Sequence, residues 1–382
     1  MMKWVNSARL RLASQTQTPY KTFIASVLFV ALSLITTPAS SATLNAMAGQ
    51  MIMVGFQGDS VAHFSVRDLR LMIREGRVGG VMYLKTNVAT LEDVRAMNEG
   101  FLGARSALPP LIAIDQEGGS IERLTRAVGF EEIQSAAEIA RGQTPESAKR
   151  IYARMARELS LLGFNLNFGP VVDLNINPEN PIIARYGRSF GKDPVKVAQY
   201  AAAFVSAHRS ANMLTALKHF PGHGSSTTDS HVGFVDITNT WQALELEPYR
   251  ALISNGFADM VMVGHLFHQK FSVDPSVQLP SSLSPSWITG VLRNHLGYDG
   301  VIISDDMEMA AVRKNFGLRD VVVRAIRAGT DILLFSNTAN YHIELADEVR
   351  AIIVAEARAD KSFRRLVEAA YKRIRTLKKR IP

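Results

Sequence analysis

The stretch Met213-Leu214-Thr215-Ala216-Leu217-Lys218-His219 is a short apolar run that ends in two basic side chains. An apolar run of this length predicts a short buried strand. Lys218 and His219 would then lie at the carboxyl end of that strand, where parallel α/β folds place their active sites. The stretch therefore predicts a parallel fold and the edge of that fold on which a site is expected.

Seven other short apolar runs alternate with longer amphipathic segments along the chain. The eight runs are residues 51–58, 78–84, 110–115, 165–173, 213–219, 260–265, 300–305 and 332–337. Helical patterns lie between them at residues 66–75, 91–102, 145–162, 194–210, 241–255, 285–295 and 318–328, and a last helix is expected from about Tyr341 onward. Eight alternating strands and helices predict a closed (β/α)8 TIM barrel in a single domain.

An open, doubly wound parallel sheet is the alternative architecture for such a pattern. That fold usually carries a glycine-rich phosphate-binding loop after its first strand. The first run, residues 51–58, is not followed by a loop of this kind. The closed barrel is therefore the better prediction.

The first 42 residues differ from the rest of the chain. They hold four basic residues and no acidic one, then an apolar run at residues 23–35, and then small residues with Ser40 and Ala42 before a potential cleavage point. This order is typical of a secretory signal peptide, and the apolar run is shorter than the ~20 residues of a membrane span. We therefore expect a signal peptide at residues 1–42, a barrel at residues 43–382, and a periplasmic or secreted rather than a cytoplasmic protein. An uncleaved membrane anchor is the alternative, and only that alternative would bring the protein to a membrane.

Composition excludes several functions. Without residues 1–42 the chain has 39 basic and 35 acidic residues, which gives no reason to expect a nucleic-acid partner. The basic residues between positions 361 and 380 recur at helical spacing, so they predict a solvated helix face near a helix C-terminus. The chain has no cysteine, which excludes thiol catalysis and disulfide bonds. A monomer is expected.

Ionisable groups follow five of the eight predicted strands. The third ends in Asp115, the fourth in Asp173, the fifth in Lys218 and His219, the sixth in Met262 and His265, and the seventh in Asp305 and Asp306. One such group is easily explained as a helix cap. Five together predict a polar, water-accessible site, because charges that face inward need partners.

Two groups at this edge have the properties that glycoside cleavage requires. Asp305 follows a buried strand and is therefore held rigidly, as suits a nucleophile. Asp229 precedes His231 by two residues, so its carboxylate can accept the imidazole N–H and raise the basicity of the ring. A carboxylate and a proton-carrying group are the minimum apparatus for cleavage with retained configuration, although the second group is usually a carboxylic acid.

At this point the sequence resembles glycoside hydrolase family 3, and within it the single-domain β-N-acetylhexosaminidases that include bacterial muropeptide-recycling β-N-acetylglucosaminidases. The resemblance runs from about Met51 to Ala328 and rests on motifs in a specific order. They are Ile114-Asp115-Gln116-Glu117-Gly118-Gly119 with Arg123, Gly169-Pro170-Val171-Val172-Asp173 with Asn177-Pro178, Arg188-Ser189-Phe190-Gly191, residues 218–231, and residues 296–307 around Asp305.

The resemblance implies a role for each matching residue. Asp305 would be the catalytic nucleophile and His231 the acid/base, with Asp229 orienting the imidazole. Asp306, the nearer rival for nucleophile, is expected to give structural support, because successive strand residues face opposite sides. The residues implied to bind the N-acetylglucosamine ring are Asp115, Arg123, Arg188, Lys218, His219 and Met262. Murein fragments and chitooligosaccharides are the implied substrates, and neither a metal ion nor another cofactor is implied.

The sequence departs from the family pattern at three places. Ser120 stands where a basic residue is common after the two glycines, and residues 184–187 make the stretch before Arg188 longer than usual. Both departures lie near the expected edge of the pocket, so they leave the leaving-group specificity open. The apparent signal peptide is the third departure, because the recycling enzymes are usually cytoplasmic.

Three other functions remain open at this point. His219, His223, Asp229 and His231 could surround a zinc ion in a metal-dependent hydrolase. A phosphorylase of the same family is possible because a neutral histidine, unlike a carboxylate, would not repel phosphate. A sugar-binding protein without activity is the third, which the intact Asp305, Asp229 and His231 disfavour. His223 and His265 have no assigned role, and we expect backbone carbonyls to satisfy them.

Overall fold

The computed structural model describes residues 42–104, 107–272, 277–338 and 341–382. Residues 42–382 form one compact unit. The predicted signal peptide, apart from Ala42, lies outside the described residues. Within the described ranges, every helix is too short or too polar to serve as a membrane span.

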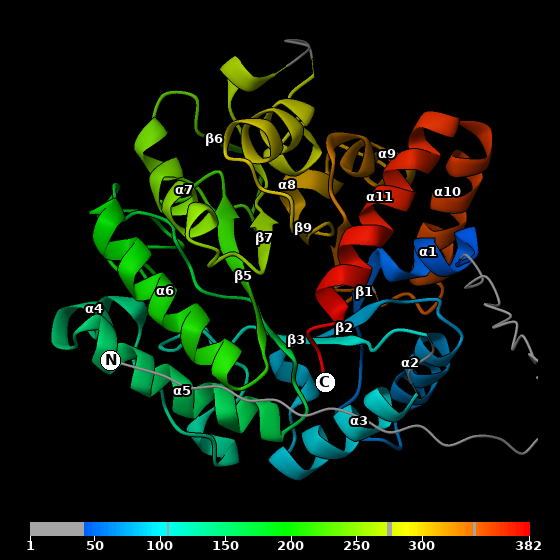
Figure 1. Cartoon of the computed structure of the whole chain (residues 1–382), viewed down its shortest axis with the longest axis horizontal. Helices are drawn as coiled ribbons and strands as arrows, with labels where there is room; N and C mark the ends of the chain where they lie inside the picture. The colour runs from blue at the N-terminus through cyan, green and yellow to red at the C-terminus, as the bar shows by residue number, and fades with distance from the viewer. Residues whose placement is uncertain (1–41, 105–106, 273–276, 339–340) are drawn as a thin grey trace, which may run out of the picture. The chain divides into compact units, whose positions relative to one another are not determined.

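Eight parallel strands form a closed barrel, and helices surround it (Figure 1). The barrel order is β1-β10-β9-β7-β5-β4-β3-β2, which closes back on β1. The strands are β1 (Ile52–Gly55), β2 (Gly80–Tyr83), β3 (Leu111–Ile114), β4 (Leu166–Asn167), β5 (Leu214–Phe220), β7 (Met260–Val263), β9 (Val301–Asp306) and β10 (Ile332–Phe335). The predicted TIM barrel is confirmed, and each strand lies within one of the eight apolar runs or extends at most one residue past it.

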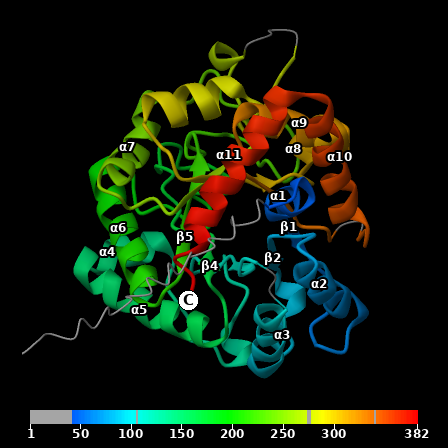
Figure 2. The same ribbon diagram turned by 45° about the vertical axis from the view of Figure 1, so that its right-hand side comes forward.

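The helices alternate with the strands, and Figures 1 and 2 both show α2, α3, α5 and α6 on the outside of the barrel. The α-helices are α1 (Leu44–Gln50), α2 (Phe64–Arg74), α3 (Leu91–Gly103), α4 (Ala136–Gly142), α5 (Pro145–Leu161), α6 (Pro194–Ser210), α7 (Glu247–Ser254), α8 (Ala310–Arg313), α9 (Leu318–Ala328), α10 (Leu345–Ala359) and α11 (Lys361–Lys378). A π-helix (Ser286–His295) stands between β7 and β9, where a helix is predicted.

Several elements differ from the prediction. The last helix is two helices, because the extended Asp360 ends α10 and its side chain caps the Ser362 N–H at the start of α11. Strand β4 keeps only two residues of the predicted run 165–173, which also contains Pro170, a residue with no N–H for the ladder. Outside the barrel, β6 (Val235–Asp236) pairs with β8 (Leu266–Phe267).

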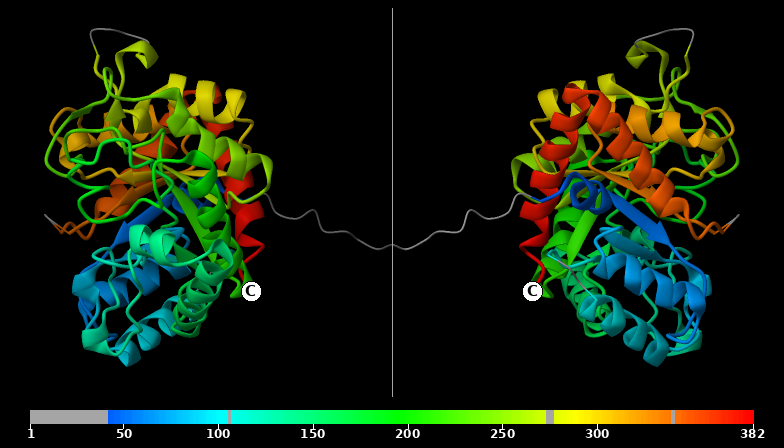
Figure 3. Two further views of the ribbon diagram at one scale, coloured as in Figure 1. Left: turned by 90° about the vertical axis from the view of Figure 1, so that its left-hand side faces the viewer. Right: turned by 90° about the vertical axis from the view of Figure 1, so that its right-hand side faces the viewer.

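Helix α11 lies across the amino-terminal ends of the barrel strands. Arg373 pairs with Asp331, the residue before β10, and Arg380 pairs with Asp259, the residue before β7. Lys378 donates to the Gly79 carbonyl beside β2. The side views in Figure 3 show α11, in red, on the side of the domain away from the long loops.

The basic face predicted for this region is therefore only partly solvated. Arg365, Lys372, Arg375 and Lys379 are exposed. Lys378, in contrast, is only 1% exposed. The prediction was wrong for this residue. Its aliphatic stem is buried, and its Nζ donates to the Gln50 side chain and to the Gly79 carbonyl.

Candidate active site

All nine predicted site residues line a single cavity of about 590 Å³. They are Asp115, Arg123, Arg188, Lys218, His219, Asp229, His231, Met262 and Asp305. Five of them (Asp115, Lys218, His219, Met262 and Asp305) lie in barrel strands or directly after one, so the convergence of the strands brings distant parts of the chain together. Apolar walls complete the cavity, formed by Met82, Phe168, Ile182 and Leu334 among others.

The floor of the cavity is a chain of alternating charges. Asp115 Oδ1 lies 2.7 Å from Lys218 Nζ, and Asp115 Oδ2 lies 2.9 Å from Arg123 Nη2. Lys218 Nζ is also 2.6 Å from Glu117 Oε1. The Glu117 carboxylate accepts two further hydrogen bonds from Arg188, at 2.8 and 2.9 Å. Every charge in this buried group thus has a partner of opposite sign, as buried charges require.

These contacts keep both carboxyl groups ionised. Burial alone would raise the pKa of Glu117, but the positive charges of Arg188 and Lys218 lower it to about 2. Burial likewise opposes ionisation of Asp115, yet Lys218 and Arg123 lower its pKa below the ordinary value. A carboxylate has about four lone-pair positions. Asp115 therefore keeps capacity to accept hydrogen bonds from sugar hydroxyls while it is held by two cations.

A glycine turn places Glu117 beside Arg188. Gly118 and Gly119 have φ angles of 101° and 60°, which glycine adopts without strain. A Cβ atom on Gly118 would stand 2.5 Å from the carbonyl oxygen of Gln134. Glycine is therefore required at this position by conformation and by space.

The side chain of Gln116 fixes the segment that carries Arg123. Its Oε1 accepts the backbone N–H groups of Arg123 and Leu124 at 3.0 and 3.1 Å, and its Nε2 donates to the Leu124 carbonyl at 2.8 Å. Gln116 is fully buried. The guanidinium of Arg123 is therefore presented to Asp115 from a segment with a defined backbone path.

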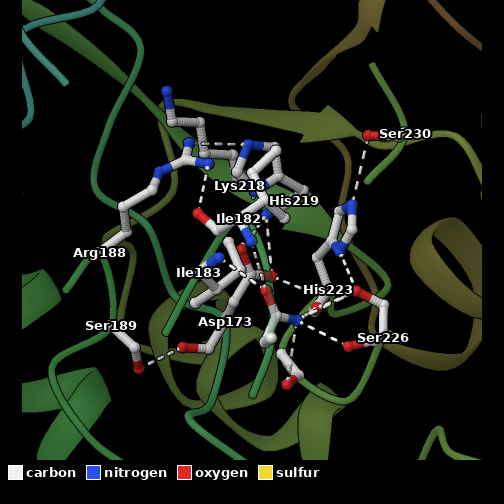
Figure 4. Close-up of polar contacts among 12 residues, drawn as sticks. Asp173, Ile182, Ile183, Arg188, Ser189, Lys218, His219, His223, Ser226 and Ser230 are labelled. Carbon is white, nitrogen blue, oxygen red and sulfur yellow. Dashed lines mark hydrogen bonds and ion pairs between the residues drawn. The ribbon is translucent and has the colours of Figure 1, made fainter. Parts of the chain in front are cut away.

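His219 is held by Asp173, as Figure 4 shows. Its Nδ1 lies 2.7 Å from Asp173 Oδ2, and its Nε2 lies 3.3 Å from Arg188 Nη2. Because a guanidinium only donates, Nε2 is the acceptor and Nδ1 carries the proton. Asp173 also accepts the backbone N–H of His223 at 2.8 Å. One buried carboxylate thus fixes both the ring of His219 and the start of the following loop.

Asp305 stands near the end of β9 and lines the cavity. Burial by itself would raise the pKa of its carboxyl group, but the neighbouring imidazoles of His265, His219 and His231 bring that pKa below the ordinary value. The backbone N–H of Asp306 donates to Asp305 Oδ1 at 2.8 Å. Asp305 is therefore an anion at neutral pH, and its main chain is fixed by the barrel.

Asp306 also lines the cavity. The pairing of β9 with β10 changes register just before Asp306, which interrupts the alternation of a regular strand. Its carboxylate accepts the backbone N–H groups of Ser336 and Glu308 at 2.8 and 3.1 Å. Burial raises the pKa of Asp306. These properties suit a residue that supports the turn after β9.

His231 and Asp229 stand together in the long loop after β5. His231 Nδ1 lies 2.7 Å from Asp229 Oδ1, which also accepts the His231 backbone N–H at 2.8 Å. The His231 side chain is 61% exposed. Burial would raise the pKa of Asp229, but its hydrogen bonds from His231 lower it. The pair thus places an exposed imidazole in the cavity lining, with Nδ1 held by a carboxylate.

The two histidines without an assigned role are both buried. His265 Nε2 lies 2.9 Å from the Asp306 carbonyl, as expected, and its Nδ1 lies 2.7 Å from the Ser282 hydroxyl. The ring of His223 instead contacts the hydroxyls of Ser226 and Ser230, at 2.6 and 3.3 Å (Figure 4). Burial lowers the pKa of both imidazoles. Burial thus disfavours the protonated form of both rings.

The four residues considered as zinc ligands do not converge. His219 Nδ1 is directed to Asp173, and both nitrogens of His223 are directed to serine hydroxyls. Within the described ranges, metal-ligand atoms cluster only at the exposed His342, Glu344 and Glu348, which do not line this cavity. The geometry therefore disfavours a zinc hydrolase built on these four residues.

Glu117 and Tyr186 are among the site residues that received no role from the sequence. Glu117 belongs to a quoted motif, but its partner Arg188 is 71 residues away. Its position two residues after Asp115 is a usable signal, since alternate residues of an extended segment face the same side. Tyr186 lines the cavity from the segment before Arg188 that is longer than usual.

Comparison with known proteins gives consistent results. The chain matches the Glycosyl hydrolase family 3 N terminal domain over residues 43–369. It is 32% identical to Beta-hexosaminidase A of Pseudoalteromonas piscicida over 320 residues, which cover 76% of this chain and 53% of that protein. It is 34% identical to Beta-hexosaminidase LpqI of Mycobacterium tuberculosis over 297 residues, which cover 76% of this chain and 72% of the relative.

A solved structure agrees with these relatives. The glycoside hydrolase family 3 beta-N-acetylglucosaminidase from Paenibacillus sp. str. FPU-7 superposes with a TM-score of 0.78 at 32% identity. The match covers 89% of this chain and 63% of that chain. The chain thus spans about half of the Pseudoalteromonas relative and under two thirds of the Paenibacillus protein. Sequence, fold and the order of the site motifs together show that this chain belongs to glycosyl hydrolase family 3.

Proposed function

We propose that the protein is a retaining β-N-acetylhexosaminidase that removes terminal β-linked N-acetylglucosamine. The observation that carries this proposal is the single cavity shared by an anionic Asp305, the His231–Asp229 pair and the Asp115–Lys218 ion pair. The relatives named hexosaminidase and acetylglucosaminidase support the same substrate class.

In the first step, the Asp305 carboxylate attacks the anomeric carbon of the sugar. A carbon–oxygen bond to Asp305 forms while the bond to the leaving oxygen breaks. His231, in its protonated form, gives the leaving oxygen its proton and becomes neutral. Asp229 stabilises the charged imidazole before the transfer and fixes the direction of Nε2.

In the second step, water attacks the anomeric carbon of the glycosyl-enzyme. The neutral His231 takes a proton from that water, and Asp305 departs as a carboxylate. Each step inverts the anomeric centre, so the product keeps the β configuration. The imidazole is again protonated and the enzyme is ready for another cycle.

We propose that the charged floor recognises the hydroxyls of the terminal sugar. Asp115 accepts from hydroxyl hydrogens, while Lys218, Arg123 and Arg188 donate to hydroxyl oxygens. His219 contributes a ring held by Asp173, and Met262 contributes an apolar wall. This set of partners favours a sugar bound deep in the cavity with its leaving group toward the mouth.

We further propose that the natural substrates are murein fragments or chitooligosaccharides outside the cytoplasm, and that the protein acts as a monomer. The basic, apolar and small-residue order of residues 1–42 supports export. N-terminal sequencing of the protein recovered from cells tests whether it is exported. A mature chain that begins near residue 43 agrees with it, whereas an intact chain found in the cytoplasm contradicts it.

A substrate panel tests the activity itself. The panel contains an aryl N-acetylglucosaminide, the matching aryl glucoside, chitobiose and a muropeptide. We expect hydrolysis of the N-acetylated substrates with the β-anomer formed first, as followed by NMR. A preference for the aryl glucoside, or an α-anomer formed first, contradicts the proposal.

Phosphorolysis is distinguished from hydrolysis by the same assay in phosphate buffer. We expect free N-acetylglucosamine at every phosphate concentration. Accumulation of a sugar 1-phosphate in proportion to phosphate would instead identify the protein as a phosphorylase.

A further inference from the structure

The cavity has a polar floor and an exposed mouth. Asp115, Lys218 and Arg188 lie at the floor, with side chains that are 16%, 3% and 7% exposed. Only Ser120, Tyr186 and His231 are exposed among the lining residues. We call these three exposed lining residues, which are the proposed acid/base, one aromatic residue and one serine, the mouth of the cavity.

The leaving group must lie at this mouth if the proposed function is correct. The terminal sugar occupies the floor, where the hydroxyl-binding charges are. His231 has to reach the leaving oxygen, so the remainder of the substrate extends past His231 toward solvent. Any lining residue that shares the mouth with His231 can contact that remainder.

Tyr186 is 39% exposed and gives the mouth its exposed aromatic surface. The guanidinium of Arg185 lies over its ring, 5.6 Å from the ring centroid. A ring held in this way and open to the cavity offers an apolar, electron-rich surface to the C–H groups of a sugar. Aromatic side chains serve this purpose at low cost in conformational entropy because they have two rotatable bonds.

Hydrogen bonds connect the segment that carries Tyr186 to the rest of the site. The Asn180 side chain donates to the carbonyl of His223 at 2.8 Å and accepts the backbone N–H groups of Ile182 and Ile183 at 2.9 and 2.6 Å. The backbone N–H of Arg185 donates to the Asn180 carbonyl at 3.1 Å. The anchored segment therefore sets where the ring of Tyr186 stands.

We infer that Tyr186 forms a binding subsite for the leaving group, in which its ring stacks on the sugar next to the scissile bond. Ser120 lines the same mouth with a small neutral side chain. This inference rests on the proposed function, and it selects oligosaccharides over substrates that lack a sugar in the leaving group.

Two substrates distinguish binding of the leaving group at this subsite from cleavage of the scissile bond. Chitobiose has a sugar as its leaving group, whereas N-acetyl-β-glucosaminyl fluoride has only fluoride. We expect Tyr186→Ala to lower kcat/KM on chitobiose about three- to tenfold, the range expected for one aromatic contact, and to leave the fluoride within about twofold of wild type. Tyr186→Phe keeps the ring and is expected to behave as wild type on both.

Phe64→Ala is the matched control, because Phe64 is 52% exposed and does not line the cavity. It should leave kcat/KM unchanged on both substrates. The melting temperature of each variant checks that it is folded. A Tyr186→Ala variant that loses activity equally on both substrates, or on neither, overturns the subsite while wild-type turnover upholds the proposed function. A folded wild-type enzyme that cleaves neither substrate overturns the proposed function and the subsite with it.

Discussion

Asp115 and Lys218 are separated by 103 residues in the chain, yet Asp115 Oδ1 and Lys218 Nζ lie 2.7 Å apart at the floor of the cavity. Asp115 follows β3 and Lys218 belongs to β5, and β4 lies between these strands in the barrel. The carboxyl ends of β3 and β5 therefore bring these two charges together across β4. The charges of the floor depend on one another, because Lys218 also contacts Glu117.

Lys218→Met should destabilise the fold as well as impair binding. The variant leaves the carboxylates of Asp115 and Glu117 without their shared cation. Breaking a buried ion pair from one side costs about 3–5 kcal/mol in free energy of unfolding. Urea denaturation at pH 7 measures this loss, and a change below about 1 kcal/mol would mean that the ion pair is solvated in solution.

Glu117 should make stability depend on acid pH. The folded-state pKa of about 2 lies below the ordinary 4.5, so its stabilisation is complete above pH 4.5 and is lost as the pH falls toward 2. Glu117→Gln cannot titrate. The difference in unfolding free energy between wild type and Glu117→Gln should therefore narrow by about 2 kcal/mol from pH 6 to pH 3. A difference that stays constant over this range contradicts the assigned pKa.

Lys378 should make stability depend on alkaline pH. This lysine is buried at the end of α11, its hydrogen-bond partners are the neutral Gln50 side chain and the Gly79 carbonyl, and burial lowers its pKa to about 7. Between pH 7 and 10.5 the unfolded chain holds a proton that the folded protein has released, so stability rises with pH.

From pH 7 to pH 9, wild type should gain about 2 kcal/mol more unfolding free energy than Lys378→Met. Parallel denaturation curves of the two proteins at both pH values measure the gain. An equal response of both proteins would show that Lys378 remains charged throughout.

His231→Ala should slow reactions in proportion to how poor the leaving group is. General acid catalysis contributes about 10²–10⁴-fold when the leaving oxygen needs a proton, and little when the leaving group is already stable as an anion. We therefore expect a loss of at least about 100-fold on chitobiose and a much smaller loss on an activated aryl glycoside. A plot of log kcat/KM against leaving-group pKa should steepen in the variant. Equal losses of kcat/KM across the series would contradict the assignment of His231 as the general acid.

The barrel could be predicted from the sequence because buried parallel strands appear in a sequence as short apolar runs. The run at 213–219 and its seven counterparts became the barrel strands, and the polar residues after them converged on one cavity. The candidates at strand ends line that cavity because the carboxyl end of a strand can be recognised locally in the sequence, whereas Arg123, Arg188, Asp229 and His231 reach the cavity from loops.

Features that depend on distant partners were not predictable in the same way. The bidentate contact of Glu117 with Arg188 joins segments that no local pattern connects. The register shift before Asp306 depends on how β9 pairs with β10, and the burial of Lys378 depends on where α11 lies on the barrel. Local periodicity describes one element at a time and therefore cannot report these contacts.

Trapping the covalent intermediate tests the central claim most directly. A 5-fluoro analogue of N-acetylglucosaminyl fluoride should form the glycosyl-enzyme faster than water removes it, and peptide mass spectrometry then locates the sugar. We predict one sugar per chain, attached to Asp305, and no label on a folded Asp305→Asn variant, whose turnover should also fall by orders of magnitude. A sugar on Asp306 or on any other residue, or an unlabelled enzyme that still turns the analogue over, would contradict the assignment of Asp305 as the nucleophile.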